Sequence, residues 1–234
     1  MLMRSLETNA EHRRQRESGF SMIELVMVLA ISIIITAASM VSFETVMKQQ
    51  RVTNAYNTTL SAMRRARDNA VSQSTSYQVT FSNTSPAPLS NLPSITVSLA
   101  PGATGFSGDQ STVTYQLPFD ISFQTNAAIT ATAAPDGFGT AASAIDFGYT
   151  ATNTTVGGQS TIYFCSDGSA QIAACATGSF QGNFSNNWDQ GVVYMARTGE
   201  LMSSRAVSLW GATGRIHGWR LYNVTNTTYQ WVRQ

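Results

Sequence analysis

A single carboxylate, Glu24, interrupts the most apolar stretch of this chain. The stretch runs from Phe20 to Phe43, and from Leu25 to Phe43 it holds 19 consecutive residues without a charge or a proline. A carboxylate at the centre of a bilayer costs roughly 2.5–3.5 kcal/mol, so an acid within a membrane span is usually functional and has a cationic partner. The chemistry that Glu24 offers is therefore charge pairing, and the open question is which group neutralises it.

Cys165 and Cys175 are the only two cysteines of the chain. In an exported domain an even pair predicts a disulfide, and closing a loop of this size is worth roughly 3 kcal/mol through loop-closure entropy. The alternative is a metal pair, but His217 is the only histidine beyond the first 19 residues. Asp167 and Asp189 could meet a calcium ion, although they lack the ligand spacing of an EF-hand. The sequence therefore favours a disulfide and predicts neither a metal site nor a cofactor.

The basic residues of the second half are concentrated near the C-terminus. No lysine or arginine occurs between Asp68 and Ala196, whereas six aspartates do. Glu200 alone opposes the arginines that follow, and aromatic residues lie among them: Arg197, Arg205, Arg215, Arg220 and Arg233, with Trp210, Trp219, Tyr222 and Trp231. Such a segment could hold nucleic acid through phosphate contacts and base stacking. Because five arginines are few for a nucleic-acid site, we favour the alternative that they pair with aspartates of the same domain or a neighbouring subunit, and that the tryptophans are core.

Enzymatic chemistry is not expected from this sequence. The chain has no glycine-rich phosphate loop, no His-Glu-x-x-His and no Gly-x-Ser-x-Gly. A Ser-His-Asp triad would have to use His217, and a lone histidine beside Trp219 is more often structural. We therefore predict that the protein is not an enzyme.

One long helix must position the N-terminal residues. From Phe20 to about Ser74 there is no proline or glycine, which predicts a helix of about 80 Å over residues 20–74. The segment from about residue 25 to residue 43 has the length and composition of a transmembrane segment. The part from about 45 to 74 is amphipathic, because one face repeats apolar residues at steps of three and four: Val52, Tyr56, Leu60, Met63, Ala66 and Ala70. Such a stripe needs a sheet to cover it.

Beyond Ser74 the apolar period changes to two, which predicts β-strands. We expect strands at residues 77–81, 95–99, 113–117, 161–165, 192–194, 205–209, 215–221 and 229–232. The turn-rich stretches 82–94, 125–143 and 176–189 are expected to be connectors. The predicted fold class is therefore α+β, with a long N-terminal helix packed on the antiparallel sheet of one globular head over residues 75–234.

The residues in front of the apolar stretch complete a recognisable pattern. Positions 1–18 contain four arginines, and the small residue Gly19 lies before the apolar stretch, whereas a secretory signal would have it afterwards. The positive-inside bias places this end in the cytoplasm. Gly19-Phe20-Ser21-Met22-Ile23-Glu24, followed by the apolar span, resembles the leader junction of type IV pilins and pseudopilins.

This resemblance implies a prepilin leader over residues 1–19, removed by a prepilin peptidase that cuts after Gly19. It further implies methylation of the new N-terminus at Phe20 and a pilin-like fold. Glu24 would then be an assembly determinant that faces the freed amine of a neighbouring subunit. A buried ion pair contributes little stability, and its best-attested use is to fix register. A plain single-pass anchor with an incidental glutamate is the alternative.

A helix segment and two C-terminal turns resemble the GspH/FimT-type minor pseudopilins. The segment 62–71 looks like the Ala-Arg-x-x-Ala signature of that group. Thr198-Gly199-Glu200 and Ala212-Thr213-Gly214-Arg215-Ile216 look like its paired glycine turns. The implied protein is a minor subunit near the tip of a type II secretion pseudopilus or a type IV pilus.

The same resemblance implies a location and a set of partners. The chain would cross the bacterial inner membrane once, with its head in the periplasm, before it enters a periplasmic or cell-surface filament. Its partners would be the prepilin peptidase, other pilin or pseudopilin subunits and the assembly platform. Some FimT-type subunits are thought to capture DNA for uptake. In this chain Arg215 and the nearby Arg220 would then contact the DNA, which is the alternative function.

Overall fold

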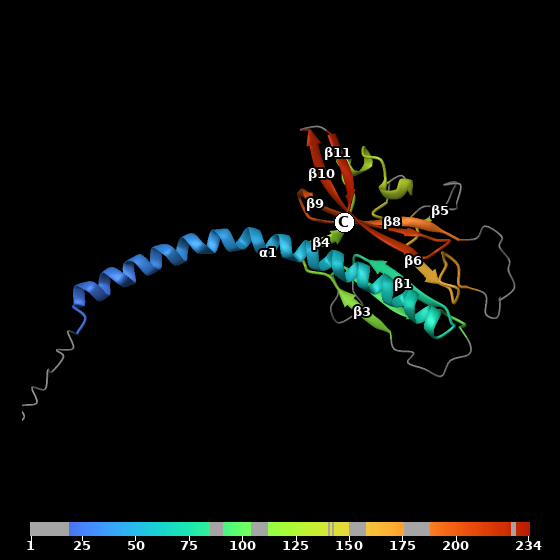
Figure 1. Cartoon of the computed structure of the whole chain (residues 1–234), viewed down its shortest axis with the longest axis horizontal. Helices are drawn as coiled ribbons and strands as arrows, with labels where there is room; N and C mark the ends of the chain where they lie inside the picture. The colour runs from blue at the N-terminus through green and yellow to red at the C-terminus, as the bar shows by residue number, and fades with distance from the viewer. Residues whose placement is uncertain are drawn as a thin grey trace, which may run out of the picture. The chain divides into compact units, whose positions relative to one another are not determined.

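The computed structural model describes residues 19–84, 91–103, 112–139, 141, 143–149, 158–175, 188–225 and 228–234. It divides into two units, Met1–Val46 and Met47–Gln234. The helix α1, Met22–Ser72, contributes residues to both (Figure 1). The predicted leader lies outside the described residues except for Gly19.

In the first unit, α1 begins directly behind Gly19 and Phe20. The carbonyl of Ser21 accepts the first hydrogen bond of the helix, from the amide of Leu25 at 3.1 Å. The hydroxyls of Ser32, Thr36 and Ser39 each donate to the carbonyl four residues earlier, at 2.7–2.8 Å, so these polar groups are satisfied inside the helix. The large apolar side chains here are exposed. By length and composition, the helix could cross a membrane.

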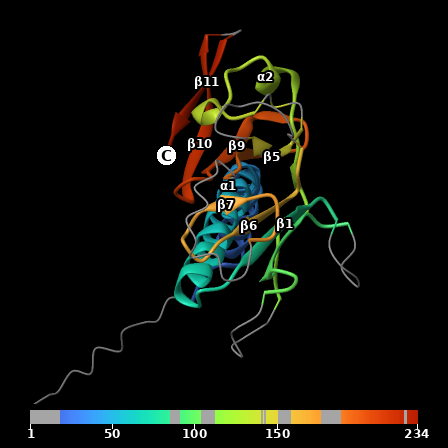
Figure 2. The same cartoon turned by 90° about the vertical axis from the view of Figure 1, so that its right-hand side faces the viewer.

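In the second unit, α1 packs its apolar face against both sheets, as the period of three and four predicts. Every residue of the predicted face is buried: Val52, Tyr56, Leu60, Met63, Ala66 and Ala70. These side chains share one core cluster with strands of each sheet, for example Phe81 in one and Leu209 in the other. Figure 2 shows the strands gathered around this part of the helix. The helix therefore packs against both sheets, which also contact each other directly, since the ring centroids of Phe81 in one sheet and Phe147 in the other are 5.4 Å apart.

The first sheet is antiparallel and has the strand order β3-β2-β1-β6-β7. Its strands are β1 (Tyr77–Ser82), β2 (Ser94–Leu99), β3 (Val113–Gln116), β6 (Thr161–Phe164) and β7 (Ala170–Gln171). Val79 in the central strand lies opposite Val97 on one side and Ile162 on the other. This register places the alternating apolar residues of β1 toward the helix.

The second sheet is also antiparallel, in the order β11-β10-β9-β8-β4, and β5 pairs with β8 as well. Its strands are β4 (Ile121–Phe123), β5 (Ile145–Tyr149), β8 (Gln190–Arg197), β9 (Glu200–Trp210), β10 (Arg215–Thr225) and β11 (Thr228–Arg233). With the long helix and two antiparallel sheets, the chain is α+β.

The predicted strands all coincide with observed ones, but the connector predicted over residues 125–143 is not structureless. It contains a helical turn, α2 (Ala127–Thr130), and a 3-10 turn, η1 (Pro135–Gly137). The side chain of Asn126 caps α2 by accepting from the amide of Ile129 at 3.0 Å. Ile129 then packs in a second core cluster behind the sheet with Val192, Tyr194 and Leu221. Because the segment is rich in Ala and Thr, its composition did not indicate that Ile129 would be buried.

Candidate functional sites: the helix start and a basic cleft

The predicted processing site lies in exposed, non-helical backbone. Gly19 and Phe20 precede the helix and are exposed, and no heavy atom lies within 4 Å of the position that a Cβ on Gly19 would take. Glu24 lies in the first turn of α1, where a carboxylate interacts favourably with the helix dipole. Within the described residues, Glu24 is exposed and has no hydrogen bond or ion pair. The Gly19–Phe20 peptide bond is therefore accessible, and the Glu24 carboxylate is free to pair with a cationic group.

Cys165 and Cys175 form the predicted disulfide, with their Cα atoms 5.6 Å apart. Asp167 shapes the enclosed loop, since its Oδ1 accepts from the amide and the hydroxyl of Ser169 at 2.8 and 2.6 Å. Asp189 accepts from the amide of Ile172 at 2.9 Å. Burial raises the pKa of Asp189 above its usual value, and this hydrogen bond lowers it in part. No group of three metal-ligating side chains occurs among the residues described.

Arg67 of α1 ties the disulfide loop to the glycine turn before β10. Its Nε donates to the carbonyl of Gly168 at 3.3 Å and its Nη2 to the carbonyl of Thr213 at 3.1 Å. Gly214 has a φ of +58°, and a Cβ there would overlap the Gly168 carbonyl oxygen. Only glycine fits such a position. Three segments that are far apart in the sequence are thus fixed against one another.

A basic cleft of about 350 Å³ opens at this junction. It is lined by Arg64, Arg67 and Asp68 of α1 together with Gly214, Arg215, Ile216, His217 and Arg233. Within the described part of the chain, Arg64, Arg215 and Arg233 make no ion pair. Asp68 is the only carboxylate of the lining. The cleft therefore carries an excess of positive charge and is suited to an anion.

The structure does not bring the two predicted DNA-contacting arginines together. Arg215 lines the cleft and Arg220 does not. Five positions along β10 separate them, and side chains at an odd spacing on a strand point to opposite faces. Arg64, Arg67 and Arg233 take the place of Arg220 beside Arg215. Sequence reasoning did not identify Arg64 and Arg67 of the helix. The only indication was that Arg64 lies outside the apolar face of the helix.

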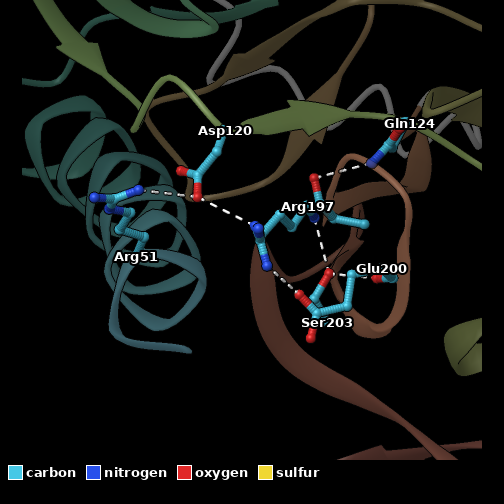
Figure 3. A network of polar contacts seen from close by, with 7 residues as sticks. Arg51, Asp120, Gln124, Arg197, Glu200 and Ser203 are labelled. Carbon is cyan, nitrogen blue, oxygen red and sulfur yellow. Dashed lines mark hydrogen bonds and ion pairs between the residues drawn. The ribbon is translucent and has the colours of Figure 1, made fainter. Parts of the chain in front are cut away.

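For Arg197 the predicted pairing with acids of the same domain is confirmed (Figure 3). Its Nε lies 3.3 Å from Asp120 Oδ2, and its Nη1 lies 2.6 Å from Glu200 Oε2. Asp120 also accepts from Arg51 of α1 at 3.3 Å. The backbone amide of Arg197 donates to Ser203 Oγ at 2.8 Å. This network connects the helix to β8 and β9 and leaves Arg197 neutralised.

His217 belongs to a structural network and not to a triad geometry. Asp136 Oδ2 accepts from Ser208 Oγ at 2.5 Å and lies 3.0 Å from His217 Nδ1. The indole of Trp219 donates to Ser208 Oγ at 2.8 Å. Ser208 is fully buried and donates to the aspartate, not to the imidazole. The network holds η1 against β9 and β10.

Of two further tryptophans that were predicted to be core, Trp231 is buried, whereas Trp210 is 40% exposed, so for Trp210 the prediction is wrong. Trp231 is buried in the second core cluster, and Trp210 packs edge-on against Phe138 with ring centroids 4.8 Å apart.

Comparisons of the chain with family models, curated proteins and solved structures found no match. The function must therefore be inferred from the residues described above.

Proposed function

We propose that this chain is a minor subunit of a pilin-like filament, a type II secretion pseudopilus or a type IV pilus. One observation carries the proposal: an exposed apolar helix starts directly behind an exposed Gly19–Phe20 bond and holds in its first turn a carboxylate that has no partner among the described residues. A helix of 51 residues whose outer part is covered by antiparallel sheets supports the same interpretation, since this is the plan of a pilin.

In this proposal the leader remains in the cytoplasm until a prepilin peptidase cuts between Gly19 and Phe20. The cut creates an α-amine on Phe20, which is then methylated. When the assembly platform moves the subunit from the inner membrane into the filament, Glu24 faces the amine of a neighbouring subunit and fixes the register of the two helices. The head folds in the periplasm, an oxidising compartment that agrees with the Cys165–Cys175 disulfide.

Mass spectrometry of the mature N-terminus tests this proposal. When the chain is expressed with an active prepilin peptidase, the expected N-terminus is N-methylated Phe20. Gly19→Val should leave the full-length membrane form. A wild-type leader that stays intact while a known prepilin is processed in the same cells would refute the proposal and favour a plain membrane anchor.

The role of Glu24 is tested by its incorporation into filaments. Glu24→Ala should be processed normally but enter filaments poorly, because its carboxylate can no longer pair with the neighbouring amine. Ser32→Ala is the matched control within the same exposed span, since the Ser32 hydroxyl bonds only the Val28 carbonyl of its own helix, at 2.7 Å. Equal incorporation of the two variants would contradict the role of Glu24.

A second function, capture of DNA, is favoured by the cleft that contains Arg215. Its test is an electrophoretic shift of DNA by residues 47–234. Arg215→Ala with Arg233→Ala should weaken binding and reduce the salt slope by about 0.7–0.9 for each phosphate that the variant no longer neutralises. Arg51→Ala with Arg65→Ala removes the same charge outside the cleft. No binding at low salt, or equal effects of the two pairs, would discard this function.

A further inference from the structure

Two arginines lie directly opposite each other on β9 and β10. Arg205 and Arg220 are partners in the register of the antiparallel pair. Opposed residues share one face of a sheet, with Cβ atoms about 4.5–5.5 Å apart, and like charges in this position are destabilising. The shared face is the one toward α1, because Val207 and Leu209 on the same strand belong to the core cluster that includes the helix.

Neither guanidinium is neutralised by an acid within the part of the chain that the structure describes. Arg205 is only 8% exposed, and its Nη1 donates to the carbonyls of Ser203 and Ser204 at 3.2 Å each. Burial, and then the charge of Arg220, lower the pKa of Arg205 to about 10. The Nε of Arg220 is buried and has no hydrogen-bond partner in the described segments. Among the residues described, no carboxylate lies within ion-pair distance of either side chain. Unneutralised buried charge of this kind is costly.

The surroundings of the pair resemble a protein interface. The guanidinium of Arg220 lies over the ring of Tyr222 at 5.1 Å, and Tyr222 is 38% exposed. Val232, opposite Arg220 on the other side, is 43% exposed. β11, which carries Val232, forms an edge of the second sheet. Arginine and tyrosine beside exposed aliphatic surface are typical of protein-binding sites, and an open strand edge can accept a further strand.

We propose that Arg205 and Arg220 form a receptor for a carboxylate side chain on a protein segment that docks along β11. A carboxylate matches the planar donor fork of arginine and would neutralise the repulsion between the two side chains. A nucleic acid fits less well, because Arg205 is buried whereas backbone phosphates contact exposed basic side chains. The receptor does not depend on the filament function.

The test uses the full-length protein in non-ionic detergent, with N-acetylglutamate N-methylamide as the probe. Thermal unfolding of the head, followed by near-UV circular dichroism, should shift upward with the probe and saturate, because a ligand that binds only the folded state stabilises it. The neutral glutamine analogue should give no shift. In Arg220→Gln the half-saturating probe concentration should rise about tenfold or more, as expected when a charged partner is removed, whereas Arg65→Gln should behave as wild type.

Two results of the ligand titrations would overturn the receptor. One is the absence of a saturable shift with the glutamate probe. The other is an equal or larger shift, at matched ionic strength, with inorganic phosphate or oligothymidine, which would indicate a nucleic-acid site. Arg220→Met provides a measurement without ligand, since it keeps most of the aliphatic stem and removes one like charge. The receptor predicts an unchanged or higher melting temperature for this variant, and a clear decrease would show that the pair is merely structural.

Discussion

Removal of the disulfide should cost the head a predictable part of its stability. The bond joins residues that are 10 positions apart, and a loop of this size corresponds to roughly 3 kcal/mol of loop-closure entropy. Residues 47–234, the head together with the helix segment that packs on it, form a compact unit with its own core. This unit, called the head below, can therefore be studied alone. For a domain of this size 1 kcal/mol shifts the melting temperature by about 2–4 °C, and the expected decrease is therefore roughly 6–12 °C.

The assay is urea and thermal unfolding of Cys165→Ser with Cys175→Ser, followed by tryptophan fluorescence. Wild-type head in reductant should coincide with the double variant, which controls for the serine side chains. Amide exchange at Gly168 should also become faster, because this residue lies inside the loop and donates to the Cys165 carbonyl at 2.9 Å. A decrease of less than about 1 kcal/mol would show that Arg67 and the surrounding packing hold the loop without the disulfide.

Further predictions concern the glycine turn, the Asp136 network and the pH dependence of the head. Gly214→Ala should destabilise the head by about 2 kcal/mol or more, compared with about 1 kcal/mol for Gly199→Ala, because both have positive φ but only Gly214 meets a backbone oxygen; urea midpoints measure the difference. Asp136→Ala should cost about 2–3 kcal/mol in the same assay, since it leaves buried donors unpaired, and Asp136→Asn should cost less. Burial raises the folded-state pKa of Asp189, so its ionisation opposes folding. Below pH 3.8, Asp189 is protonated in both the folded and the unfolded protein. The free energy of unfolding of Asp189→Asn, relative to that of wild type, should therefore rise between that pH and pH 7. A difference that does not change with pH over this range would contradict a raised pKa of Asp189 in the folded state.

Periodicity predicted the long elements because it records which face of an element is buried. The face of α1 that begins at Val52 and the alternation in β1 could both be read from the sequence. β4 and β7 are three and two residues long, and such lengths leave no period to detect. In β5 the alternation is broken by Gly148, at a shift in register with β8.

The basic cleft could be predicted only in part, because its members come together through long-range packing. Arg215 was identified from its glycine turn, whereas Arg64 and Arg67 reach the cleft only because α1 lies against that turn. The opposition of Arg205 and Arg220 is different, since it follows from local register. Trp210 pairs with Arg215 around the turn, and counting five residues outward along both strands gives this pair. Recognition of the hairpin would have found it.

The acids and the cations of the head are used differently. Asp146 accepts from the hydroxyl of Tyr149 and the amide of Gly158, and Asp136, like Asp189, is hydrogen-bonded within its own domain. These carboxylates stabilise turns and are not available to the arginines. A fold shaped by stability alone would place an acid beside a buried cation such as Arg205, because an unpaired buried charge is among the most costly features of a core. No acid among the described residues fills that position, and a carboxylate of a binding partner would supply the missing charge.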